Sequence, residues 1–98
     1  MPDTQWEQGH AVIRDETGLH ARPAVKLTKL AKTFDSQVEI RPRGNEGWVN
    51  AKSPSAVMKL KAPHLVTLEI RACGNDAQDA VTAMRDLIDR DFDDAAAA

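Results

Sequence analysis

Three histidines are the side chains in this sequence best suited to nucleophilic or ligand chemistry, and one of them has a chemically distinctive setting. His20 follows a glycine turn at Gly18 and directly precedes Ala21-Arg22-Pro23. An imidazole nitrogen can form a covalent intermediate with a group in transfer. The planar donors of Arg22, two residues further on, match the geometry of phosphate oxygens. These residues predict an anion site built around a nucleophilic histidine.

The residues after His20 predict a helix that positions this site. Apolar side chains recur at three- and four-residue spacings from Ala24 to Phe34. Pro23 is compatible only with the first turn, so the helix is expected to begin at residue 20 or 21. First-turn amides lack partners within the helix, and the helix dipole favours an anion beside them. The alternative is that His20 merely caps the helix, a role more usual for Ser, Thr, Asp or Asn.

The other residues capable of chemistry predict no second site. His10 lies near a strand end and His64 follows Pro63 in a loop, and no pair of histidines has helical metal-ligand spacing. Cys73 is the single cysteine, so it is interpreted as a packed residue near a strand end. A Gly-rich phosphate loop and paired carboxylates are absent from the sequence. We therefore expect no metal, no cofactor and no nucleotide site, which favours a carrier over an enzyme.

The remaining pattern predicts the element order β-α-β-β-α-β-α. Strands are expected within residues 5–13, 37–43, 48–51 and 66–73. Pro42 indicates an edge strand or the end of a ladder. A short helix should begin at Ser53-Pro54 and stop before Pro63, and a last helix over residues 77–88 should be capped by Asn75. This order indicates an α+β fold with a mainly antiparallel sheet and helices on one face.

Length and composition narrow the function. The 98 residues suit one domain, assigned to residues 1–90, with an acidic, alanine-rich tail or linker at 91–98. The 13 basic and 15 acidic residues give a charge of −2, which argues against nucleic-acid binding. No apolar run approaches the roughly 18 residues of a membrane span, and the N-terminus has no signal pattern. A cytoplasmic protein is expected.

Two segments resemble the HPr family, the histidine phosphocarriers of the bacterial sugar phosphotransferase system. Gly18-Leu19-His20-Ala21-Arg22-Pro23-Ala24 resembles the active-site signature of that family. Asn50-Ala51-Lys52-Ser53, followed by a short helix, resembles its second motif. The resemblance covers roughly residues 5–90. It implies an open-faced two-layer sandwich with an antiparallel sheet in the order 1-4-2-3 and three helices on one face.

The resemblance also implies a mechanism and partners. Phosphorylated enzyme I would give its phosphoryl group to Nδ1 of His20, and the carrier would pass it to a histidine on a IIA domain. Arg22 matches the family arginine that neutralises the phosphoryl charge, and the amides of Ala21 and Arg22 would donate to it. Lys26 and Lys29 on the same helix would steer acidic partners. The carrier is expected to be monomeric.

Ser53 has two interpretations. Its place before Pro54 is typical of an N-cap, whereas the resemblance implies the serine that a regulatory kinase phosphorylates in many bacteria. Pro54 and Ser55 stand where the family usually has large apolar residues that belong to its docking patch. Apolar docking contacts are therefore expected from four other residues: Leu19, Val25, Val57 and Met58.

Two carrier functions and one unrelated function stay open. The chain resembles sugar-uptake carriers in its motifs, while the ending Arg90-Asp91-Phe92-Asp93-Asp94 is similar to the nitrogen-related branch, which acts in regulatory signalling. The alanine tail equally suggests a domain of a larger phosphotransferase chain. The unrelated alternative is a nucleic-acid or small-ligand module. The two Phe and two Trp do not form the aromatic strand pattern that RNA-binding sheets carry.

Overall fold

The computed structural model describes residues 6–16 and 18–92 and has the element order predicted from the sequence. The strands are β1 (Glu7–Val12), β2 (Gln37–Pro42), β3 (Val49–Asn50) and β4 (Thr67–Cys73). The helices are α1 (Ala21–Ala31), α2 (Pro54–Lys59) and α3 (Ala77–Asp89). Predictions that concern Gln5, Thr17 and the tail residues 93–98 lie outside the described residues.

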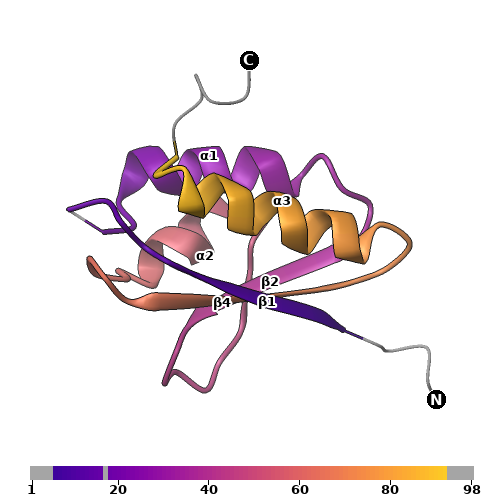
Figure 1. The fold of residues 1–98 in the computed structure, drawn as a ribbon, viewed down its shortest axis with the longest axis horizontal. Helices are drawn as coiled ribbons and strands as arrows, with labels where there is room; N and C mark the ends of the chain where they lie inside the picture. The colour runs from indigo at the N-terminus through magenta and orange to yellow at the C-terminus, as the bar shows by residue number, and fades with distance from the viewer. Residues whose placement is uncertain (1–5, 17, 93–98) are drawn as a thin grey trace.

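The four strands form one antiparallel sheet in the order β1-β4-β2-β3, as the family resemblance implied. All three helices cover the same face of this sheet, and the other face is open (Figure 1). Pro42 is the last residue of β2, which is an interior strand. Its missing amide therefore ends a ladder and does not mark an edge.

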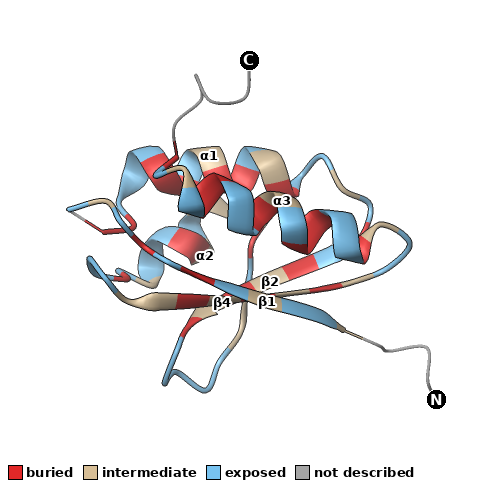
Figure 2. Cartoon of the chain, in the orientation of Figure 1, coloured by how far each residue is buried: buried red, intermediate tan, exposed pale blue. Residues whose placement is uncertain are grey.

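The core fills the space between the sheet and the helices. β4 alternates strictly, with Leu68, Ile70 and Ala72 buried and the residues between them only half-buried. On α3, the buried residues follow the helical period found in the sequence: Ala77, Ala80, Val81, Met84, Leu87 and Ile88. Figure 2 shows these buried positions on the surfaces where strands and helices meet. The core is thus made almost entirely of aliphatic side chains.

The two predicted caps have different outcomes. Ser53 precedes α2 and its Oγ accepts a hydrogen bond from the Ala56 amide at 3.3 Å, which confirms the cap. The cap predicted at Asn75 is wrong, because Asp76 is the residue that precedes α3. Asp76 does not cap the helix with its side chain either. Its carboxylate instead accepts hydrogen bonds from the loop before β2, from the Asp35 amide (3.0 Å), the Ser36 amide (2.9 Å) and the Ser36 hydroxyl.

The core includes a residue that follows the last helix. Phe92 is buried in the core with a relative exposure of 4%. Its carbonyl oxygen accepts a hydrogen bond from Nζ of Lys26 on α1, at 2.7 Å. Asp91 and Phe92 therefore belong to the fold and lie close to the start of α1. Within residues 6–16 and 18–92, no helix has the length and apolar character needed to cross a bilayer.

Candidate functional site

His20 is the residue that immediately precedes α1, and its side chain does not cap the helix. The backbone of His20 is extended, and its carbonyl accepts the Ala24 amide at 3.0 Å as the first helical hydrogen bond. No side-chain hydrogen bond caps this end. The imidazole is 43% exposed. The capping alternative is therefore wrong, and the ring is open to a reacting group.

The turn before His20 is fixed by close packing against the loop that follows α2. Gly18 has a φ of +77°, a conformation that side chains rarely adopt. A Cβ atom at Gly18 would lie 2.3 Å from the carbonyl oxygen of Ala62. That same oxygen accepts the Leu19 amide at 2.7 Å, and the His20 amide donates to the Gly18 carbonyl at 3.0 Å. These contacts set the position of the imidazole relative to α1.

The first turn of α1 presents donors and no negative charge. The amides of Ala21 and Arg22 lie ahead of the first intrahelical hydrogen bond, and Pro23 has no amide to leave unsatisfied. The turn contains no acidic residue. Arg22 is exposed, and among the described residues it makes no ion pair, so its guanidinium donors are available to an anion. The arrangement suits a phosphoryl group bound on His20.

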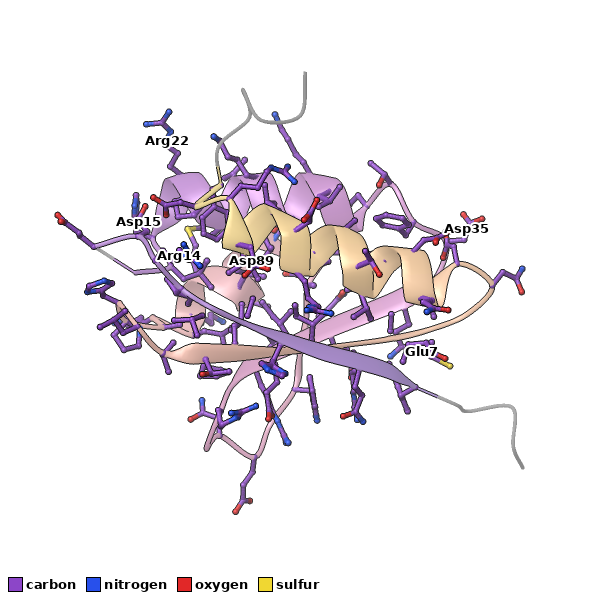
Figure 3. The ribbon with its side chains drawn as sticks, viewed as in Figure 1. Glu7, Arg14, Asp15, Arg22, Asp35 and Asp89 are labelled. Atoms are coloured by element: carbon purple, nitrogen blue, oxygen red, sulfur yellow. The ribbon has the colours of Figure 1, made fainter. Side chains whose placement is uncertain are left out.

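Residues from three parts of the chain line the hollow around His20. The hollow has a volume of about 490 Å³ and is lined by the loop before α1, the start of α1 and the end of α3: Asp15, His20, Arg22, Pro23, Lys26, Arg90, Asp91 and Phe92. Figure 3 shows Asp15 and Arg22 at the same end of the molecule, with the Arg22 side chain extending outward. Three cationic side chains therefore surround the predicted phosphoryl acceptor.

A larger groove of about 790 Å³ adjoins this hollow and runs between α1 and α3. Its apolar floor includes Val25, Leu30 and Leu87, and its cationic lining consists of Arg22, Lys26, Lys29 and Arg90. The structure thus brings the predicted residues Val25, Lys26 and Lys29 together beside His20. Leu87 and Arg90 were not predicted as site residues, because only the packing of α3 on α1 brings them there.

Burial revises the apolar docking set. Leu19 (3% exposed) and Val57 (0%) are buried in the core and support the surface from below, and Leu19 also lines a hollow with His20. Val25 (41%) and Met58 (38%) are exposed. Met58 lines a third hollow with His20 and Ala21. The docking roles of all four residues stay predictions, because proximity to the site in the sequence does not distinguish a surface residue from a core residue.

Asp15 is a site residue that the sequence reasoning missed. Its Oδ2 lies 3.4 Å from Nε2 of His20. The contact depends on the tight turn between them, in which the Gly18 amide donates to the Asp15 carbonyl at 2.9 Å. A carboxylate five residues before a histidine gives no periodic signal, so only the folded turn reveals the pair.

The remaining candidates are separate from this site. His10 pairs with Glu69 in the register of β1 and β4, and His64 is exposed in the loop before β4. Within the described parts of the chain, no three His, Cys, Asp or Glu side chains gather as a metal site would require. Ser53 is half-buried and its hydroxyl serves as the α2 cap. Its regulatory phosphorylation stays a prediction.

Sequence comparisons identify related proteins over almost the whole described fold. Residues 8–90 match the family described as the phosphotransferase-system HPr component phosphorylation site. The phosphocarrier protein HPr of Cupriavidus necator is 40% identical over 85 residues, which covers 87% of this chain and 93% of that protein. Both matches include the His20 turn and the start of α1.

Solved structures show the same fold. HPr from Thermoanaerobacter tengcongensis superimposes with a TM-score of 0.80 at 34% identity, covering 88% of this chain and 94% of that one. A second structure of that protein, described as a dimer, gives 0.69 at 35% identity, covering 84% and 92%. A histidine-containing phosphocarrier protein of Mycoplasma gives 0.78 at 37% identity, covering 90% and 99%.

Proposed function

The chain belongs to the HPr family of phosphotransferase-system phosphocarriers, and we propose that it accepts a phosphoryl group on Nδ1 of His20 from phosphorylated enzyme I and passes it to a IIA component. The observation that carries this proposal is the exposed His20 imidazole at the start of α1, where it caps nothing. Beside it lie the first-turn amides and Arg22, which makes no ion pair with any described residue. No other histidine has such a setting in the described chain.

The site supplies what a temporary phosphoryl carrier needs. The Ala21 and Arg22 amides and the Arg22 guanidinium can donate to the phosphoryl oxygens, and each charge-assisted hydrogen bond stabilises the group. Each 1.4 kcal/mol of extra stability would shift the transfer equilibrium tenfold, so over-stabilisation would trap the group. The imidazole is 43% exposed, so a partner can compete for it. Binding by exposed donors suits a relay better than a closed cage would.

The surface beside His20 suits proteins as donors and acceptors. We propose that partners contact the exposed apolar residues Val25 and Met58, and that Lys26 and Lys29 attract acidic surfaces during encounter. We propose that the chain acts as a monomeric domain in the cytoplasm. On this account enzyme I obtains the phosphoryl group from phosphoenolpyruvate, and the carrier binds neither phosphoenolpyruvate nor ATP.

A regulatory branch uses the same chemistry on His20 with different partners. In that version, the phosphorylation state would report nitrogen or carbon status through the proteins that bind it. The sugar-uptake and regulatory functions can be distinguished by which version of enzyme I phosphorylates the chain. Faster labelling by the nitrogen-branch enzyme than by the sugar-branch enzyme would assign the chain to regulation.

A transfer assay with labelled phosphoenolpyruvate and enzyme I tests the role assigned to the site. Replacing Arg22 with alanine removes a charged donor and should slow phosphoryl acceptance by roughly tenfold or more. Arg85→Ala is the matched control, because Arg85 is exposed on α3 and lines none of the hollows around His20. Equal rates for the two variants would remove Arg22 from the mechanism.

A further inference from the structure

Asp15 and His20 form a close carboxylate–imidazole pair whose geometry selects one ring nitrogen. Asp15 Oδ2 lies 3.4 Å from Nε2, with the two side chains 27% and 43% exposed. The turn that joins them is held by hydrogen bonds from the Gly18 amide to the Asp15 carbonyl and from the Leu19 amide to Ala62. The hydrogen bond to the Asp15 carbonyl therefore helps to place the carboxylate. The ring turns Nε2 toward the carboxylate, and Nδ1 points in a different direction.

A carboxylate accepts hydrogen bonds and donates none when it is ionised. A neutral imidazole carries its proton on one nitrogen, and the partner of that nitrogen decides which tautomer is favoured. Asp15 therefore favours the ring with the proton on Nε2 and the lone pair on Nδ1. We propose that Asp15 is a positioning residue that keeps the Nε2 proton in place before and after phosphorylation, an inference that rests on the proposed function of His20.

With the proton held on Nε2, each bond and each charge in the transfer step is accounted for. The Nδ1 lone pair attacks the phosphoryl group as the bond from phosphorus to the donor protein breaks, and the donor group leaves with the electron pair of that bond. The Nε2 proton stays, so the phosphorylated ring is an imidazolium cation next to the Asp15 carboxylate. In the second transfer the new phosphorus–nitrogen bond breaks, its electron pair returns to the ring, and His20 leaves as neutral imidazole. Without the proton on Nε2, the ring would leave as an anion, which is a much poorer leaving group.

Other charged groups line the hollows around the same ring and affect how strongly it holds the Nε2 proton. The hollow around His20 is lined by Asp15, Arg22, Lys26, Arg90 and Asp91, and the neighbouring hollow adds Lys61. The cations disfavour a positive ring, and Asp15 is the carboxylate at ion-pair distance from Nε2. Replacing Asp15 with asparagine leaves all the cations in place and removes the opposing charge. In Asp15→Asn, the Nε2 proton of the phosphorylated ring should therefore be held less strongly.

The test compares Asp15→Asn with Glu16→Gln, which makes the same charge change in the same loop. Glu16 is exposed, and its carboxylate forms no ion pair with any described residue. Each protein is phosphorylated with phosphoramidate, a small donor that needs no enzyme I, and the loss of phosphoryl is followed from pH 6 to 9. We expect Asp15→Asn to lose phosphoryl about two- to fivefold more slowly than Glu16→Gln above neutral pH, with the rates converging near pH 6.

Superimposed pH profiles for the two variants would overturn the inference, since a merely structural role would change stability but not the profile. A second readout needs no phosphorylation. Nitrogen-15 NMR of the wild-type ring should show the proton on Nε2, and a proton on Nδ1 would also overturn the inference. A failure of the proposed function would give a different experimental result. Wild-type protein labelled by phosphoramidate but never by enzyme I would remove the carrier role and leave the Asp15 comparison readable.

Discussion

Replacing Gly18 with alanine tests whether the turn before His20 is held as tightly as its contacts indicate. The φ of +77° costs a non-glycine residue about 1–2 kcal/mol. The added Cβ would also lie 2.3 Å from the Ala62 carbonyl oxygen, a backbone atom that cannot rotate away. Relief would separate the two loops and lose the 2.7 Å hydrogen bond from Leu19 to that oxygen, which costs about 1–3 kcal/mol for a buried group.

We therefore expect Gly18→Ala to lower the free energy of unfolding by about 2–5 kcal/mol, against about 5–15 kcal/mol for a typical domain. Gly44→Ala is the matched control, because Gly44 also has a positive φ (+100°) but a Cβ there would meet nothing within 4 Å. It should cost only about 1–2 kcal/mol. Urea titrations of both variants measure the difference. Equal losses would show that the Gly18–Ala62 contact does not constrain the turn.

Three further perturbations test local features of the fold. Thr28→Val should raise the free energy of unfolding by about 1 kcal/mol, because the buried Thr28 hydroxyl has no hydrogen-bond partner in the described chain; no gain on thermal melting would contradict this. Ser53→Ala should cost about 0.5–2 kcal/mol through the lost cap of α2, and an unchanged melting temperature would rule the cap out. The Ser36 hydroxyl, aided by two loop amides, lowers the pKa of the Asp76 carboxyl. The ionised Asp76 therefore stabilises the fold above about pH 4, and this stabilisation is lost as the pH falls further. Asp76→Asn should therefore flatten the acid limb of the stability–pH curve, and a limb as steep as in the wild type would exclude this role.

Local chemistry made much of the fold predictable from the sequence. Pro23 can occupy only the first turn of a helix, which placed the start of α1 correctly. The alternation in β2 and β4 depends on one buried face, and the same alternation appears in their burial. The Ser53 cap was predictable because the cap and the amide that donates to it lie within three residues of each other.

Features that depend on distant segments were not predictable in this way. Asp76 looks like an ordinary helix-start residue, but its carboxylate serves a loop 40 residues away in the chain. Phe92 was assigned to a tail, yet it packs in the core because α3 directs the chain back over α1. Leu19 and Val57 were expected on the surface near His20, and tertiary packing buries both. Only the folded turn brings Asp15 to His20.

The most direct test of the central claim is to locate the phosphoryl group among the three histidines. Enzyme I and labelled phosphoenolpyruvate are incubated with the wild type and with His10→Ala, His20→Ala and His64→Ala, since His10 and His64 are exposed histidines outside the site. The account predicts acid-labile, alkali-stable label in all except His20→Ala, which should fold normally and remain unlabelled. Label retained at wild-type rate by His20→Ala, or lost only with His10 or His64, would contradict it.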